Sequence, residues 1–163
     1  MKLLLIYIFF VFLSCTQHCA YSEIIKGKVV GVSDGDTVTV LDSEKVQYKI
    51  RLTGIDAPEK AQPYGQVSKK SLSDLVFNKD VEISWEKRDR YQRILGKVLL
   101  DKQDICLEQV KRGMAWHYKQ YQRDQSLEDR TSYDLAEKKA REAKLGLWAD
   151  DAPVEPSQFR HKK

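Results

Sequence analysis

Apolar and polar residues alternate in short stretches of the first hundred residues, a pattern typical of strands that bury one face. The clearest stretch spans 46–53, where the apolar positions are Val46, Tyr48, Ile50 and Leu52. Residues 81–86 alternate in the same way, and further apolar or β-branched runs lie at 29–31, 37–40 and 95–100. The pattern predicts five short strands, with polar connections at 42–45 and 89–93.

Three other segments have helical spacing. Residues 64–78 carry apolar side chains at roughly three- and four-residue steps, and residues 104–112 begin with a capping aspartate and end before Gly113. The longest segment begins near Ser126, which is followed by acidic residues in the manner of a capping box. Its apolar stripe, on an otherwise charged helix, consists of Tyr133, Ala136, Ala140, Ala143 and Leu147.

Strands with interspersed and appended helices predict an α+β fold. Closing five short strands into a small barrel, fully or in part, would protect their edges from pairing with other chains. One domain is the default for 163 residues. We expect that domain at 21–149, followed at 150–163 by a flexible basic tail that contains Pro153 and Pro156.

Residues 1–20 have the pattern of a secretory signal peptide. Lys2 precedes an apolar run at 3–13 that is too short to span a bilayer comfortably, and Ala20 fits the position before a cleavage site. The expected protein is therefore secreted or periplasmic. Lipid attachment at Cys15, which would make a lipoprotein, is a second interpretation, and a retained membrane anchor is a third.

Cysteine content and charge narrow the class of protein only slightly. Cys15 and Cys19 both precede Ala20, so cleavage there would leave Cys106 alone, most simply as a small buried residue, and would exclude an intrachain disulfide framework. The formal net charge is +4, or +3 without residues 1–20. This mild excess permits a polyanionic partner but does not require one.

Two acidic clusters could supply catalytic carboxylates. Asp34 and Asp36 flank a glycine just before a predicted strand. Asp56 and Glu59 begin and end an Asp-Ala-Pro-Glu turn, in which the proline restricts the backbone and fixes one carboxylate relative to the other. Each cluster is also ordinary chemistry for a turn or a helix start, so neither identifies a site by itself.

Two arginines lie where they could bind phosphate. Arg51 is on the polar side of the clearest strand, and Arg93 ends the connection at 89–93. A guanidinium donates two parallel hydrogen bonds to phosphate oxygens and stays charged at any working pH. Two of them would oppose the charge that develops on a pentacoordinate phosphate. For each arginine taken singly, a solvated surface charge is the alternative.

A hard cation would complete this chemistry. Asp36 and Asp56 offer carboxylate oxygens, and the backbone carbonyl of Ala57 could be a third ligand. Calcium tolerates such a flexible oxygen shell, whereas magnesium requires more regular geometry. A structural zinc site is not expected, because His117 and His161 lack ligand spacing with a cysteine.

Several aromatic residues are candidates for stacking on bases or for hydrogen bonds to phosphate. They are Tyr91, Trp116, Tyr118 and Tyr121. Partial burial under the barrel is an equally good interpretation of Trp116 and Tyr118.

These motifs resemble the staphylococcal nuclease (thermonuclease) family from about Ile24 to Trp148. The markers keep the order and spacing of the family, and lie at 33–37, 51–59, 64–65, 89–93, 113–116 and 146–148. The resemblance implies a five-stranded OB-fold barrel with three α-helices. It also implies calcium-dependent cleavage of DNA and RNA by water, with release of the 5′-oxygen and 3′-phosphate ends.

The resemblance further implies a role for each site residue. The metal ligands by position are Asp36, Asp56 and the backbone carbonyl of Ala57. The catalytic residues are Glu59 as the base that activates water, and Arg51 and Arg93 as phosphate clamps. Near the positions that contact the substrate are Arg90, Tyr91 and Tyr121. Asp34 is expected to fix its turn rather than to bind the metal.

Two departures from the best-known family member affect the expected rate and loop dynamics rather than the reaction. Ala57 replaces a threonine, and the segment Lys60–Pro63 is shorter than the mobile loop of that member. The leading hypothesis is a secreted, monomeric, metal-dependent endonuclease with no stable protein partner. A non-catalytic nucleic-acid-binding OB-fold domain and a calcium-binding surface lipoprotein are the alternatives; the complete set of charged residues argues against a decayed site.

Overall fold

A computed structural model describes residues 23–161 of the chain. The expected signal peptide at 1–20, with Cys15 and the cleavage position Ala20, lies outside the described residues. Within 23–161, no helix is both long and apolar enough to cross a membrane.

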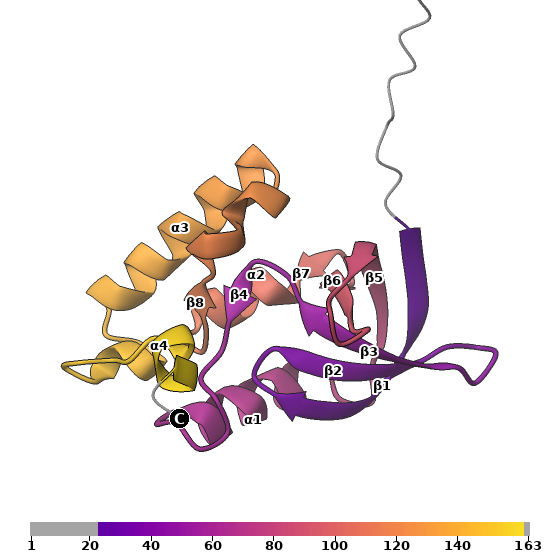
Figure 1. Cartoon of the computed structure of the whole chain (residues 1–163), viewed down its shortest axis with the longest axis horizontal. Coiled ribbons are helices and arrows are strands. Elements are labelled where there is room, and N and C mark those ends of the chain that lie inside the picture. Colours follow the sequence, from indigo (N-terminus) through magenta and orange to yellow (C-terminus); the bar gives the residue numbers. More distant parts are fainter. Residues whose placement is uncertain (1–22, 162–163) are drawn as a thin grey trace, which may run out of the picture.

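A five-stranded barrel forms one side of the molecule (Figure 1). Its strands are β1 (Glu23–Asp34), β2 (Thr37–Leu41), β3 (Gln47–Leu52), β5 (Asp80–Arg88) and β6 (Ile94–Leu100). They are antiparallel neighbours in the order β3-β2-β1-β5-β6, and a parallel pairing of β3 with β6 closes the barrel. The expected α+β fold with a five-stranded OB-type barrel is therefore confirmed.

Three short strands complete the pairing. β7 (Gln103–Asp104) extends the sheet beyond β6, whereas β4 (Ile55–Asp56) pairs with β8 (Trp116–His117) in a separate ladder. Asp56 lies opposite Trp116 in that ladder. A residue of the Asp-Ala-Pro-Glu turn is thus fixed between the barrel and the helices that follow it.

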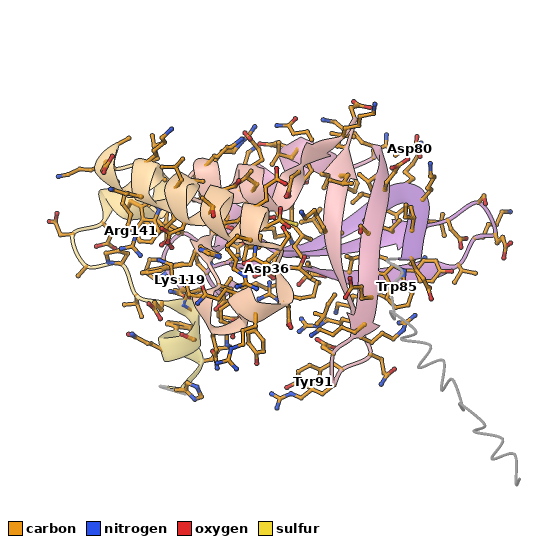
Figure 2. All side chains as sticks on the ribbon, turned by 90° about the horizontal axis from the view of Figure 1, so that it is seen from above. Asp36, Asp80, Trp85, Tyr91, Lys119 and Arg141 are labelled. Atoms are coloured by element: carbon orange, nitrogen blue, oxygen red, sulfur yellow. The ribbon has the colours of Figure 1, made fainter. Side chains whose placement is uncertain are left out.

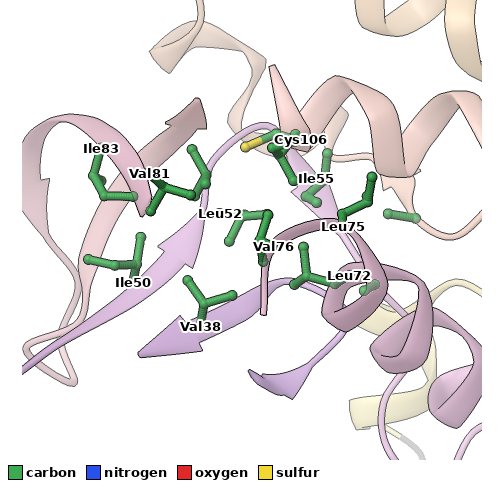
Figure 3. Close-up of a cluster of buried hydrophobic side chains, with 14 of the residues drawn as sticks. Val38, Ile50, Leu52, Ile55, Leu72, Leu75, Val76, Val81, Ile83 and Cys106 are labelled. Carbon is green, nitrogen blue, oxygen red and sulfur yellow. The ribbon is translucent and has the colours of Figure 1, made fainter. Parts of the chain in front are cut away.

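Most apolar positions of the alternating stretches fill the barrel interior (Figure 3), whereas Val46, which precedes β3, is exposed. Val38, Ile50 and Ile83 are fully buried, and each has polar or less buried neighbours along its strand. Cys106 is free and buried in the same cluster, as expected for a small apolar side chain. Removing a large side chain from such a core destabilises a domain by about 2–5 kcal/mol.

The three expected helices are present. They are α1 (Gly65–Val76), α2 (Ile105–Lys111) and α3 (Leu127–Glu142). Asp104 caps α2 by accepting a hydrogen bond from the Leu107 amide, and Ser126 caps α3 by accepting one from the Asp129 amide. Two 3-10 segments, η1 (Lys119–Asp124) and η2 (Gly146–Ala149), flank α3.

The described part of 150–163 differs from the expected loose tail, because it contains a fourth helix, α4 (Pro156–His161). Pro156 is buried, and the Gln62 side chain donates a hydrogen bond of 2.6 Å to the Val154 carbonyl. Figure 1 shows α4 beside the chain that connects β4 to α1. Pro153 and Pro156 suggest a loose end, but proline suits the first turn of a helix, and apolar neighbours here give the segment a surface to pack on.

Candidate active site

Both carboxylate oxygens of Asp36, the residue before β2, accept hydrogen bonds. One carboxylate oxygen accepts the Thr37 hydroxyl at 3.1 Å, and the other accepts the Ala57 amide at 2.7 Å. Asp34 accepts the Asp36 amide at 3.2 Å, so it fixes the turn. These contacts link the two acidic clusters to each other, although 21 positions separate Asp36 from Ala57.

The buried side chain of Gln109, in α2, stabilises the turn that contains Gly35. The Gln109 side-chain amide donates to the Gly35 carbonyl at 2.9 Å and to the Ser68 carbonyl at 3.2 Å, and accepts the Ser71 hydroxyl at 2.7 Å. A Cβ atom on Gly35 would overlap the Ser68 hydroxyl and lie 2.7 Å from Ala57 Cβ, so only glycine fits. Sequence analysis missed Gln109. The pattern that could have indicated it is a polar residue on the apolar face of α2, beside Ile105, Cys106 and Val110.

Arg51 joins the two metal-ligand candidates. β3 pairs with β2 so that Arg51 lies opposite Thr37, and its guanidinium forms ion pairs with Asp36 and, at 2.9 Å, with Asp56. Only 12% of its side chain is exposed, so it is not a solvated surface charge. Although burial alone would lower it, the pKa of Arg51 is raised by the carboxylates of Asp36 and Asp56.

Burial raises the pKa of the Asp36 carboxyl to about 7, although the Arg51 guanidinium favours the charged form. The carboxylates of Asp34 and Asp56 raise this pKa further. The carboxyl groups of Asp34, Asp36 and Asp56 therefore lie close enough to affect one another, and an additional cation close to Asp36 would stabilise its ionised state.

Glu59 and Asp56 converge on one cationic atom. One guanidinium nitrogen of Arg160 in α4 lies 3.1 Å from an Asp56 oxygen and 2.9 Å from a Glu59 oxygen, while a second nitrogen lies 2.9 Å from the other Asp56 oxygen. Asp56 is buried, whereas 40% of the Glu59 side chain is exposed. The Glu59 amide donates to the Gln62 side chain at 3.1 Å, which fixes the turn. Arg160 and Gln62 are two further residues that sequence analysis missed.

Arg93 lies in the loop between β5 and β6 and is held locally. Both oxygens of the Asp89 side chain are used: one accepts the amides of Tyr91 and Arg93, at 2.8 and 2.9 Å, and the other accepts the Arg93 guanidinium at 2.7 Å. Ile94 pairs with Ile50 in the parallel ladder of β6 and β3. Arg93 thus directly precedes the residue that lies opposite the neighbour of Arg51.

The expected substrate-binding residues fall into two places. Tyr91 is 64% exposed at the tip of the β5–β6 loop (Figure 2), with the Arg90 guanidinium carbon 4.8 Å from its ring centre. Tyr121 is half-exposed in η1, with its ring 4.9 Å from that of Tyr118. Burial raises the pKa of the Tyr118 hydroxyl, and the Asp56 carboxylate raises it further.

Trp116 is packed rather than free to stack on a base. Its ring centre lies 4.4 Å from that of Trp148, and the Arg141 guanidinium carbon lies 4.7 Å and 3.7 Å from the two ring centres. Of the two interpretations of Trp116, partial burial is therefore the one that the structure supports. The stack joins α3 to η2 and holds the helical layer together.

The donor set suits a hard cation. Among residues 23–161, no three His, Cys, Asp or Glu side chains are grouped as a metal site. The expected set needs only the side chains of Asp36 and Asp56 together with a backbone carbonyl. The Asp36 and Asp56 carboxylates meet at Arg51, and Asp56 and Glu59 meet at Arg160, so oxygen donors of the kind that Ca²⁺ takes are present here.

A family model described as staphylococcal nuclease homologue matches residues 49–150. This chain belongs to the staphylococcal nuclease family. The matched residues include Arg51, the Asp56–Glu59 turn and Arg93, whereas Asp36 precedes them and Arg160 follows them. Membership supports nuclease activity, and nucleic acids as substrates.

Individual relatives agree with the family model. A protein of Haemophilus influenzae named as an uncharacterized endonuclease is 50% identical over 136 residues, which cover 83% of this chain and 73% of the relative. An Escherichia coli protein with the same name is 44% identical, covering 85% and 87% of the two chains. A protein of Shigella flexneri named micrococcal nuclease is 37% identical, covering 83% and 80%.

Proposed function

We propose that this protein is a calcium-dependent endonuclease that hydrolyses phosphodiester bonds of DNA and RNA and leaves 3′-phosphate ends. The observation that carries the proposal is the meeting of Asp36, Arg51 and Asp56 in one charged cluster, with the exposed Glu59 beside it. Family membership supports the nuclease part of this proposal. The choice of cation is supported by the all-oxygen donors.

Each residue of the cluster has a distinct task in the proposed reaction. Asp36, Asp56 and the Ala57 carbonyl would hold the ion, which when bound would lower the pKa of a water molecule and neutralise phosphate charge. Glu59, the most exposed carboxylate of the cluster, accepts a proton from the attacking water. Arg51 and Arg93 donate hydrogen bonds to the non-bridging phosphate oxygens.

One bond to phosphorus forms and one breaks in the proposed reaction. A bond forms between the water oxygen and phosphorus, and the bond from phosphorus to the 5′-oxygen breaks. The 5′-oxygen takes a proton from solvent, assisted by a hydrogen bond from Arg93. The phosphate stays on the 3′ side of the break, which gives the expected ends.

The test is digestion of single- and double-stranded DNA and of RNA with calcium and with a chelator, followed by end-group analysis. We expect cleavage with calcium, loss in chelator, and 3′-phosphate ends. Glu59→Gln should lower the rate by about a hundredfold or more, whereas the control Glu44→Gln, in the exposed turn between β2 and β3, should not change it. Undiminished cutting in chelator would contradict the metal dependence. Tight binding of DNA without product would favour a non-catalytic binding domain.

We also propose that the protein is exported and acts as a monomer. The support for export is the basic start, apolar run and small residues at 1–20. Mass spectrometry of the protein from its native host should find a mature N-terminus near Tyr21, whereas a lipidated Cys15 would indicate a lipoprotein. A retained Met1 would contradict export by cleavage, and a dimer in size-exclusion chromatography would contradict the monomer.

A further inference from the structure

The guanidinium of Arg160, in α4, contacts the carboxylates of Asp56 and Glu59. It forms a bidentate pair with Asp56 and a single hydrogen bond to Glu59. These hydrogen bonds and ion pairs raise the pKa of Arg160, with the Asp56 contact as the largest cause. The contacts link positions more than 100 residues apart in sequence, so they are a feature of the fold and not of local geometry.

The segment that carries Arg160 is anchored next to the site. Gln62 uses its carbonyl oxygen to accept the Glu59 amide and its nitrogen to donate to the Val154 carbonyl. Pro156 is buried at the start of α4. The turn that carries Glu59 and the segment that leads into α4 therefore share a single buried side chain, which brings Arg160 back over the carboxylates.

A guanidinium in this position uses the oxygens that a metal ion needs. Both oxygens of Asp56 are within hydrogen-bond distance of Arg160, and one of them also contacts Arg51. A calcium ion held by both Asp56 oxygens, at an ordinary distance of about 2.3–2.6 Å, would take the place of the Arg160 guanidinium. A divalent ion on the oxygens that Arg160 uses would be strongly repelled by this guanidinium at such short range.

We propose that the segment from Val154 to His161 is an internal plug, in which Arg160 competes with the catalytic metal ion for Asp56 and also occupies the Glu59 carboxylate. The inference rests on the proposed metal-dependent function. Metal binding and release of α4 are then coupled, and each favours the other by the same factor. Arg51 stays in place in both states, because it is buried and also held by Asp36, whereas 39% of the Arg160 side chain is exposed.

Calcium affinity, measured by isothermal titration calorimetry, tests the competition without relying on activity. A plug that is closed about nine-tenths of the time weakens the apparent affinity about tenfold, so Arg160→Gln should bind calcium on the order of ten times more tightly than the wild type. Lys60→Gln is the matched control, since it removes one positive charge next to Glu59 from an exposed lysine. It should change the affinity by less than about twofold, as expected for a screened surface charge.

The outcomes separate this inference from the proposed function. If the wild type binds calcium and cuts DNA but Arg160→Gln binds calcium no more tightly, the plug is wrong and the proposed function stands. An equal gain in Arg160→Gln and Lys60→Gln would also overturn the plug, because general charge would explain it. If neither the wild type nor Arg160→Gln binds calcium, both proposals fail.

A second measurement follows the segment itself. Backbone ¹⁵N relaxation of residues 154–161 should report an ordered segment without metal and a mobile one when calcium saturates the site. In Arg160→Gln, the same residues should be mobile under both conditions. A segment that stays equally ordered in the calcium-saturated wild type would overturn the plug.

Discussion

Arg51 and Arg93 have the same expected role, but the fold holds them in opposite ways. Arg51 is 12% exposed and forms ion pairs with two buried carboxylates from other elements, Asp36 and Asp56. Arg93 is 27% exposed and pairs with Asp89, four residues away in the same loop. The first arginine is thus part of the long-range structure of the barrel, whereas the second belongs to a local unit.

Because of this difference, catalysis can be changed without a loss of stability at Arg93 but not at Arg51. Removing one partner of a buried ion pair leaves an uncompensated charge, which is far more destabilising than the loss of a more exposed pair such as Arg93–Asp89. The Asp89 carboxylate would still accept two backbone amides without Arg93. A substitution of Arg51 in the barrel therefore affects both phosphate binding and stability, whereas a substitution of Arg93 in the loop can affect phosphate binding alone.

The largest effect is expected for Arg51→Ala. It should lower the rate of DNA cleavage by about a hundred- to a thousandfold and the free energy of unfolding by about 3–5 kcal/mol in the absence of metal. Urea unfolding and single-turnover digestion measure the two losses. Arg51→Lys keeps the charge without the planar fork, so it should recover stability more than activity. A cleavage defect without any loss of stability would contradict the assigned coupling.

Next in size is Arg93→Ala, which isolates the catalytic part of the same role. We expect a comparable fall in rate, about a hundredfold or more, with a change in unfolding free energy of less than about 1 kcal/mol. The same two assays apply, and Arg112→Ala, in an exposed i,i+4 pair with Glu108 on α2, is the control that should leave cleavage intact. Destabilisation as large as that of Arg51→Ala would remove the distinction between barrel and loop.

The barrel residues were largely predictable from sequence because their signals are local. Strand alternation at 46–53 identifies Ile50 and Leu52 as core and puts Arg51 on the other face, and the helix caps Asp104 and Ser126 mark their own helices. The two turns with Asp36 and Asp56 follow from their motifs. What alternation alone left open was whether Arg51 is solvated, because its burial depends on where the two carboxylates meet.

The missed residues act over long distances in the sequence. Gln109 contacts Gly35 across 74 positions, and Arg160 contacts Asp56 across 104. No periodicity or spacing within a segment predicts such a contact, since it depends on how α2 and α4 pack on the barrel. A lone glutamine and a basic chain end have ordinary surface interpretations until the fold brings their partners together.

A smaller effect on the barrel side is expected for Gln109→Met. The substitution keeps the approximate volume but leaves the carbonyls of Gly35 and Ser68 without their donor, so it should destabilise the protein by about 1–3 kcal/mol. The turn that holds Asp36 would loosen, and cleavage should fall severalfold. Denaturant unfolding and calcium titration test this. The β5–β6 loop should keep its NMR chemical shifts, and a change there would contradict its independence from the barrel.

The smallest effect is expected at the tip of the loop, for Tyr91→Ala. Tyr91 is 64% exposed, and its ring contacts the guanidiniums of Arg90 and Arg93, so the free energy of unfolding should change by less than about 0.5 kcal/mol. If the ring stacks on a base, its loss should weaken binding by about 1 kcal/mol, roughly a fivefold rise in KM at unchanged kcat. Tyr91→Phe retains the ring and should retain the wild-type KM. An unchanged KM in Tyr91→Ala would mean that the loop does not bind the base. Arg93 would then be the one side chain of the loop that contributes to the reaction independently of barrel stability.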